Sequence, residues 1–146
     1  MNDISQIYSQ QILHLCSDVP RQGRIKDAHG SATCHARLCG STITVDVKLE
    51  EDCIADFAHE IEACALGRAA ASYLARHAIG KNLKELKALQ EIMHAMLESD
   101  GTPPKGEWSE LKIFENVRHY PSRHASTLLT FDATVAAMEQ AIENLK

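Results

Sequence analysis

The feature that most constrains the fold is the run STITVDVKLE at residues 41–50, in which polar and apolar residues alternate strictly. In an extended chain successive side chains point to opposite faces, so this pattern predicts a β-strand with one buried and one solvated face. Asp46 falls on the face predicted to be solvated. The apolar face carries Ile43, Val45, Val47 and Leu49. The rest of the chain must therefore supply partner strands and a layer that covers the apolar face.

Weaker alternation on either side of this run predicts two more strands. The strand over residues 53–63 places Ala55, Phe57 and Ile61 on one face. The strand over residues 30–38 has an apolar face made of Ala32, Cys34, Ala36 and Leu38. Because the connections between the three segments are short, they favour antiparallel hairpins. The three segments together predict a three-stranded antiparallel sheet.

Helical spacing of apolar residues accounts for most of the remaining chain. The first helix has Asp3 as a plausible cap, the second ends before Gly80, and the third begins with Asn82 followed by Glu85 in the capping-box spacing. The predicted helices span residues 3–16, 65–79, 82–97, 108–117 and Pro121 to about residue 145, the last with Val135, Met138, Ile142 and Leu145 inward. This order of elements predicts an α+β fold, one domain over residues 1–146, with the helices packed on one face of the antiparallel sheet.

The overall charge narrows the classes of partner. The chain has 15 Lys and Arg against 20 Asp and Glu, a formal net charge of −5, and it has no basic run. Nucleic acid and anionic membrane surfaces are therefore not expected partners. No apolar stretch approaches the roughly 18 residues of a membrane span, and the first residues lack a secretory leader. A cytoplasmic protein is expected.

Two of the five cysteines occupy positions suited to chemistry. Cys39 precedes Gly40 in the turn between the first two strands, and Cys64 stands where the third strand gives way to the alanine-rich helix. The positive end of a helix dipole favours the thiolate form, which binds zinc or iron and accepts sulfur. The hairpin order brings both residues to the same edge of the sheet. The alternative, a pair of small buried residues, stays open, and a structural role is expected for Cys16, Cys34 and Cys53.

Two stretches carry a resemblance to a known family. The segment LCGSTITVDVKLE, followed by CIADFAHEIEACALGRAAAS, resembles the iron–sulfur cluster assembly scaffolds of the IscU, SufU and NifU N-terminal type. Their Cys-Gly-Asp turn is matched by Cys39-Gly40-Ser41, and their cysteine before a small-residue helix is matched by Cys64. Downstream, VRHYPSRHASTLLTF is similar to the SufU-type stretch V-R-x-F-P-A-R-x-K-C-A-T-L, which contains the family's third cysteine at the position held here by Ser126. The resemblance runs from about residue 3 to 145.

The resemblance implies a protein that binds iron or a transient cluster, of the 2Fe-2S type, and does not turn over a small substrate. Carried over position by position, it implies Cys39 and Cys64 as metal ligands. Ser41 and Ser126 replace an aspartate and a cysteine ligand, and neutral serine oxygen is a poor ligand for zinc or iron. His124, His119 or a second subunit would have to complete the coordination, and His124 is the best internal candidate because it lies near the expected ligand at a helix start. The implied partners are a cysteine desulfurase and apo iron–sulfur acceptor proteins.

Two alternatives accompany this hypothesis. One is a zinc-dependent sulfur acceptor of a desulfurase, as the SufU branch implies. The other is a metal-free protein-binding module of the same fold. Arg118 and Arg123 flank the Ser126 segment and are candidates to offset thiolate charge or to bind a carboxylate of a partner, or else they face solvent.

Overall fold

Three antiparallel strands form the sheet on which the rest of the chain packs. In the computed structural model, which describes residues 7–38 and 40–146, the strand order is β1-β2-β3. The strands are β1 (Gly30–Ala36), β2 (Ser41–Glu50) and β3 (Cys53–Glu62). The pairing register sets His35 against Thr42 and Thr42 against Glu62. The end of β1, the start of β2 and the end of β3 therefore lie at one edge of the sheet, as the sequence predicted.

The predicted alternation of β2 is confirmed, because its four apolar side chains are buried. Two flanking predictions are wrong. Leu38 lies beyond the end of β1 and is 82% exposed. Ala55 is exposed rather than sharing the buried face with Phe57, because the pairing of β2 with β3 shifts between Lys48 and Leu49 and leaves Ala55 as an extra residue.

Asp46 lies on the outer face of the sheet but is buried, which corrects the prediction of a solvated side chain. The segment 18–29 folds across this face on its way from the first helix to β1. From that segment Arg24 donates two hydrogen bonds to the Asp46 carboxylate, Nε to Oδ2 at 2.7 Å and Nη2 to Oδ1 at 3.2 Å, and the Ile25 amide donates a third at 2.9 Å. Burial alone would raise the pKa of Asp46, but these hydrogen bonds outweigh it and lower the pKa overall.

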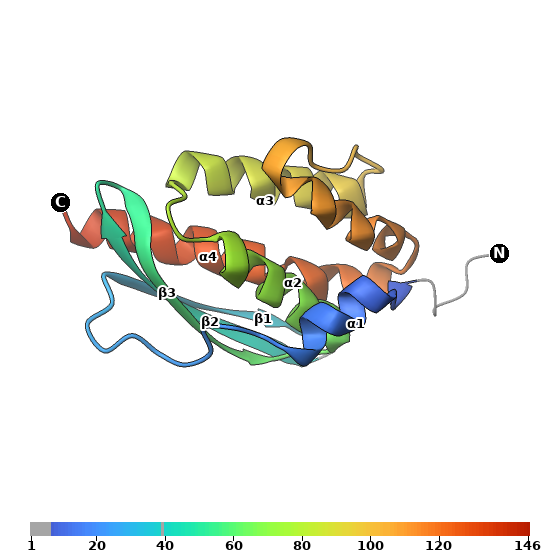
Figure 1. The fold of residues 1–146 in the computed structure, drawn as a ribbon, viewed down its shortest axis with the longest axis horizontal. Coiled ribbons are helices and arrows are strands. Elements are labelled where there is room, and N and C mark those ends of the chain that lie inside the picture. The colour runs from blue at the N-terminus through green and yellow to red at the C-terminus, as the bar shows by residue number, and fades with distance from the viewer. Residues whose placement is uncertain (1–6, 39) are drawn as a thin grey trace.

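The helices cover the other face of the sheet in two layers (Figure 1). The inner layer consists of α2 and α4, which pack on β3 and on β1 and β2 respectively, while α1 packs against α2. The outer layer consists of α3 and the 3₁₀ helix η2. The bounds are α1 (Gln10–Ser17), α2 (Ala65–His77), α3 (Leu83–Glu98), η2 (Gly106–His119), the short 3₁₀ turn η3 (Pro121–Arg123) and α4 (His124–Asn144). The predicted fold class is confirmed.

Several helix boundaries differ from the predicted ones by a few residues. Ile7 is in a 3₁₀ turn, residues 8 and 9 are not helical, and Ser9 caps α1 by accepting a hydrogen bond from the Ile12 amide. The predicted cap Asp3 lies outside the described residues. At α3 the predicted capping box of Asn82 and Glu85 is present in both directions. The helix expected over 108–117 is a longer 3₁₀ helix, and the last helix begins after the η3 turn that contains the predicted Pro121.

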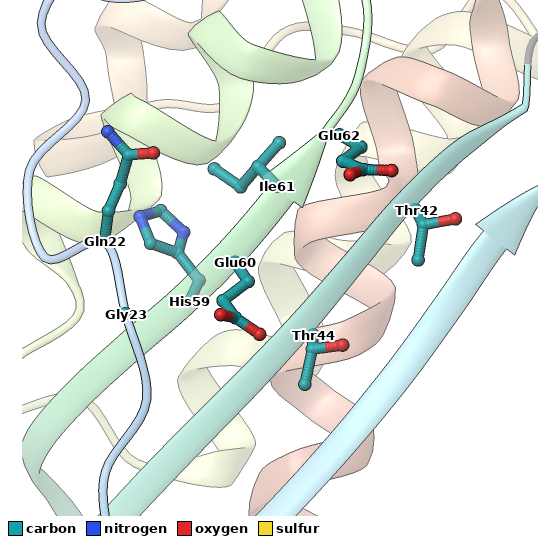
Figure 2. A pocket seen from close by; sticks show the side chains of 8 residues that line it. All are labelled: Gln22, Gly23, Thr42, Thr44, His59, Glu60, Ile61 and Glu62. Carbon is teal, nitrogen blue, oxygen red and sulfur yellow. The ribbon is translucent and has the colours of Figure 1, made fainter.

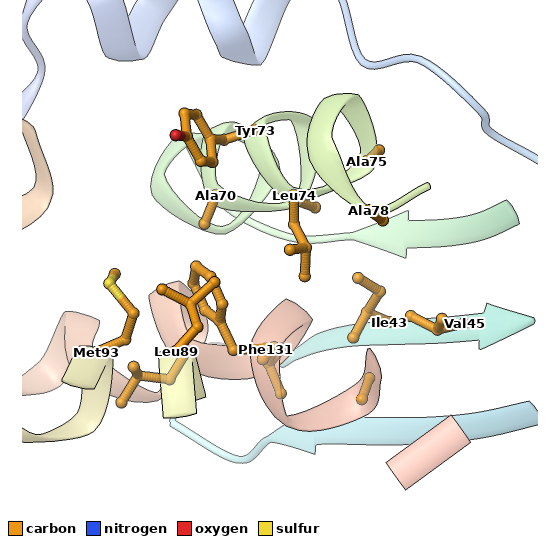
Figure 3. Packing of buried hydrophobic residues seen from close by; sticks show 14 of the residues in the cluster. Ile43, Val45, Ala70, Tyr73, Leu74, Ala75, Ala78, Leu89, Met93 and Phe131 are labelled. Carbon is orange, nitrogen blue, oxygen red and sulfur yellow. The ribbon is translucent and has the colours of Figure 1, made fainter. Parts of the chain in front are cut away.

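The core lies between the sheet and the inner helices. Figure 3 shows side chains of α2 facing Ile43 and Val45 of β2, with Phe131 of α4 among them. Towards the end of α4, Ile142 is half-buried and Leu145 is 54% exposed, so Leu145 does not point inward as predicted. None of the helices within residues 7–38 and 40–146 is long and apolar enough to cross a lipid bilayer.

Candidate thiol site

Three segments that are distant in sequence meet at the edge of the sheet where β3 ends. They are the start of β2, the residue before α2 and the first turn of α4. The Ser126 Oγ lies 3.0 Å from the Cys64 Sγ and 3.3 Å from the Ser41 Oγ. Three of the four positions that the resemblance marks as ligands are therefore brought together, although Ser126 is 62 residues from Cys64 and 85 residues from Ser41.

Local sequence explains how each side chain is placed. Cys64 is the N-cap residue of α2, with extended backbone, because the chain turns from β3 into the helix within two residues. Gly40 has a φ of 69°, a left-handed conformation that glycine adopts without strain at the entrance to β2. Gly67 allows α4 to approach α2, since a Cβ there would lie 2.8 Å from the Ser126 Oγ.

The hydroxyl groups of this cluster are shielded from water. Ser126 is 1% exposed and Ser41 is 2% exposed, whereas Cys64 is half-buried. Ser126 stands between the other two and can donate its one proton to either neighbour. The buried serine therefore contacts Cys64 without having to be a ligand itself.

The predicted juxtaposition of Cys39 with Cys64 stays a prediction, because Cys39 lies outside the described residues. Within 7–38 and 40–146, no group of three or more His, Cys, Asp or Glu side chains is arranged to hold a metal ion. This stretch of chain contributes one thiol and two neutral hydroxyls to the site. With Cys39 the donor set is two thiolates, which leaves open coordination positions on zinc or iron.

His124 is the first residue of α4, as predicted, but one of its nitrogens is already engaged. Its Nε2 lies 3.1 Å from the carbonyl oxygens of Val117 and Arg118. Because both partners can only accept, Nε2 carries the proton, and the neutral ring keeps its lone pair on Nδ1. A backbone carbonyl holding the other ring nitrogen is the usual arrangement of a metal-ligating histidine. The role of His124 as a ligand stays a prediction.

The sequence also suggested two arginines beside the site, and the structure separates them. Arg118 donates to the carbonyl oxygens of Met96 and Gly101 and pairs with Glu115, so it holds η2 against α3. Arg118 therefore has a structural role. Arg123 is half-buried, and its guanidinium makes no hydrogen bond or ion pair with any described residue.

The three cysteines expected to be structural are free and lie apart from the cluster. Cys16 is in α1 and Cys53 begins β3 at the opposite end of the strand from Cys64. Cys34 is half-buried on β1, where burial, with a smaller contribution from the negative charge of Asp132, raises the pKa of its thiol. A raised pKa favours the unreactive thiol form.

A depression of about 590 Å³ lies on the other face of the sheet and does not include the thiol site. Figure 2 shows its side chains along β2, β3 and the segment near Gly23. Polar and apolar groups line it, and none of them is a cysteine: Gln22, Gly23, Thr42, Thr44, His59, Glu60, Ile61 and Glu62. The depression is therefore a separate feature from the thiol site.

The sequence analysis treated the serines only as lost ligands and missed their contact with Cys64 through Ser126. It also missed Gly67, although an isolated glycine inside a helical pattern signals a close approach of another segment. The contact itself had no sequence signal, because it joins residues on two helices.

Comparisons with known proteins agree with this geometry. The family model described as NifU-like N terminal domain matches residues 7–127. A solved structure of a NifU-like protein (N-terminal) from Brucella abortus is similar, with 44% sequence identity and a TM-score of 0.93, covering 96% of this chain and 97% of that chain.

Curated relatives are more distant. The iron–sulfur cluster assembly scaffold protein IscU of Streptococcus pyogenes is 29% identical over 70% of this chain, and the match spans 65% of that protein's length. The protein of the same description from Thermotoga maritima is 23% identical over 92% of this chain and 94% of its own length. The zinc-dependent sulfurtransferase SufU of Bacillus subtilis is 23% identical over 65% of each chain.

Proposed function

Because the chain belongs to the NifU-like N-terminal domain family, we propose that it is an iron–sulfur cluster assembly scaffold or carrier, which holds iron or a 2Fe-2S cluster transiently through Cys39 and Cys64. The observation that carries this proposal is the convergence of Ser41, Cys64 and Ser126, since it assembles the ligand positions of the family at one edge of the sheet.

The iron or cluster is the cargo of this protein rather than a resident cofactor. Two thiolates bind it, and the neutral hydroxyls of Ser41 and Ser126 do not compete for it. A metal-bound Cys64 thiolate can only accept, so in the loaded form the Ser126 hydroxyl donates to its sulfur, withdraws electron density from that ligand and weakens its hold on the metal. A site with two thiolates and open positions suits release of the cargo to another protein better than storage.

The remaining coordination positions are filled by His124 through Nδ1 or by groups of a partner. The action is ligand exchange and not turnover of a small substrate. The partners that fit this action are a cysteine desulfurase, as sulfur donor, and apo iron–sulfur proteins, as acceptors of the cargo. Two relatives named as scaffold proteins and one named as a zinc-dependent sulfurtransferase support these partners.

Anaerobic reconstitution with ferrous iron and sulfide tests the proposal. The wild type should develop visible charge-transfer bands, and both Cys39→Ser and Cys64→Ser should lose them. Cys53→Ser is the matched control, because this free cysteine begins β3 and lies about ten residues, or roughly 30 Å, along the strand from the site. It should load like the wild type.

The Ser126→Cys variant sharpens the same experiment. It restores a third thiol 3.0 Å from the Cys64 sulfur position, so the loaded form should release iron to a chelator more slowly than the wild type. A wild type that is isolated with stoichiometric zinc and forms no cluster would favour the sulfur-acceptor alternative. A wild type that stays colourless and metal-free would contradict both and leave the protein-binding module.

A further inference from the structure

The arginines of this chain fall into two groups. Of the seven arginines, four are held in ion pairs: Arg21, Arg24, Arg76 and Arg118. The guanidinium groups of Arg37, Arg68 and Arg123 make no hydrogen bond or ion pair with any residue that the structure describes. An arginine without a partner forgoes the bidentate carboxylate pairing for which its planar group is suited.

The three arginines of the second group stand within four residues along the chain of the residues that build the thiol site. Arg37 stands two residues before Cys39 in the β1–β2 turn. Arg68 stands one helical turn after Cys64, and its amide donates to the Cys64 carbonyl oxygen. Arg123 stands three residues before Ser126. Because the residues of the thiol site meet at the Ser126 hydrogen bonds, the three arginines surround the site, and we call them the arginine collar.

The collar is accessible to a partner. Arg37 is exposed, and Arg68 and Arg123 are half-buried. Glu62, opposite Thr42 at the end of β3, lies at the same edge of the sheet as the thiol site, whereas Glu60 is paired with Arg24. Three arginines against the carboxylate of Glu62 leave a net positive charge at this edge of a chain whose formal net charge is −5.

The position of Arg68 relative to the cluster indicates the kind of anion that the collar fits. Gly67 faces Ser126, and the next residue, Arg68, is turned about 100° around the helix. Its charge acts on His59 of β3, where burial first and Arg68 second lower the pKa of that imidazole. Arg68 thus stands beside the cluster rather than over it, and the collar matches several carboxylates spaced along a chain better than one small ion.

We infer that the arginine collar is a docking surface for an acidic segment of a partner protein, which orients that partner's reactive group over Cys39 and Cys64. This inference rests on the proposed function for the role of the partner, but the binding itself requires no metal. An acidic segment is repelled by the net charge of the chain and attracted at the collar, so the collar steers the approach to the one place where cargo is exchanged.

Binding of a short oligo-glutamate peptide to the apo-protein, measured by fluorescence anisotropy at low salt, tests the inference. Oligo-glutamine of the same length is the neutral probe and should not bind. The double variant Arg37→Glu/Arg68→Glu should weaken binding of oligo-glutamate by about tenfold or more, because it reverses two of three charges. Arg37→Lys/Arg68→Lys keeps the charge and should recover most of the affinity.

Lys84→Glu is the matched control. Lys84 is exposed in the first turn of α3, forms no ion pair with any described residue, and its replacement changes the net charge by the same amount as one collar substitution. It should weaken peptide binding by less than about twofold. A melting curve and a reconstitution test should show that the collar variants fold and load iron as the wild type does.

Three outcomes would overturn the inference: an Arg37→Glu/Arg68→Glu variant that binds the peptide as tightly as the wild type, a Lys84→Glu variant that loses as much affinity as this double variant, or amide NMR shifts that fall outside the collar segments. Binding of pyrophosphate at the collar without binding of oligo-glutamate would also contradict it and would assign the surface to a small anion. Failure of iron loading with intact peptide binding would contradict the proposed function alone.

Discussion

The two ends of α4 approach the rest of the protein across a glycine, but their chemical surroundings differ. At its beginning, Ser126 meets Gly67 of α2 and joins the hydrogen-bonded cluster with Cys64. Towards its end, the backbone of Ala137 and Ala141 lies against Gly30 of β1. Both contacts exclude even a methyl group, so both are places where the helix is positioned with little freedom.

Polar groups at the far end are bound to partners within the chain. The Ser31 amide donates to Gln140 of α4, and Asn144 donates to the carbonyl oxygen of His29. Asp46, which pairs with Ser31 across the sheet, is held by the segment 18–29. At the site end, the hydroxyls bind one another and a thiol, and the guanidinium groups of the arginine collar have no partner among residues 7–38 and 40–146. The polar groups named at the far end are therefore held within the chain, whereas the collar is the surface that we propose for binding.

The largest expected effect is on stability and comes from Gly30→Ala. The new Cβ would lie 2.1 Å from the Ala137 carbonyl oxygen and 2.6 Å from the Ala141 amide nitrogen, and both are backbone atoms that cannot rotate away. We expect a loss of about 3 kcal/mol in the free energy of unfolding, measured with urea. Ser31→Ala, at the half-buried neighbouring position, loses a 3.4 Å contact of its hydroxyl with Arg24 and should cost less than about 1 kcal/mol. Equal losses in the two variants would show that the contact with α4 is not the cause.

Asp46→Asn should cause the next largest loss in the free energy of unfolding. The variant leaves the loop segment with a weaker acceptor for Arg24 and for the Ile25 amide, and we expect a loss of about 2 kcal/mol at neutral pH. The lowered pKa of Asp46 means that its contribution is present above the ordinary carboxyl pKa and is lost as the pH falls through the folded-state value. Urea titrations in acid should therefore show wild type and variant converging. A constant difference down to the lowest pH would contradict this assignment.

Much of the structure around the end of α4 that packs against Gly30 could be predicted from sequence, because it depends on local patterns. The alternation of β2 and the capping box at Asn82 involve residues a few positions apart, and both are confirmed. The burial of Asp46 could not be predicted in this way, since it depends on a loop that crosses the sheet from another part of the chain.

The site end was predicted in its location but not in its interactions. The order of the hairpins and the helix start at Cys64 brought the right segments to one edge of the sheet. The contact of Ser126 with Cys64 joins the starts of two helices that are 62 residues apart, and no local pattern encodes it. The same holds for the division of the arginines, because an ion pair depends on which acidic side chains the fold brings within reach.

Gly67→Ala perturbs the site end with a smaller cost in stability. The added Cβ would be 2.8 Å from the Ser126 Oγ, which is a side-chain atom, and 3.0 Å from the Ser126 carbonyl oxygen. The gain in helix propensity of about 1 kcal/mol offsets part of the clash, so we expect a net loss of about 1 kcal/mol.

Gly67→Ala should change the reactivity of Cys64 more clearly than it changes the stability of the protein. In a Cys39→Ser background, displacement of the first turn of α4 should raise the rate at which Cys64 reacts with an aromatic disulfide reagent by about threefold. Gly30→Ala, measured under conditions where it is folded, is the control and should leave this rate unchanged. A rise in both variants would mean that general loosening, and not the contact with Ser126, exposes the thiol.

The smallest effect concerns the middle of α4, where His94 of α3 bridges two carboxylates. Its Nε2 lies 2.8 Å from Asp132 and its Nδ1 lies 2.9 Å from Glu98. Burial alone would lower the pKa of His94, but the two carboxylates raise it overall above its ordinary value of 6.5. The protonated form donates to both, so its stabilisation is fully present below pH 6.5 and is lost as the pH rises through the raised value.

The side chain of His94 is 36% exposed, and solvent screening limits the contribution to about 0.5 kcal/mol. The difference in unfolding free energy between the wild type and His94→Gln should therefore appear in mild acid and shrink at alkaline pH. Because this bridge joins α3 to α4 away from both glycine contacts, the substitution should change neither iron loading nor binding of the acidic peptide. A change in either would mean that the two ends of α4 are coupled through its middle.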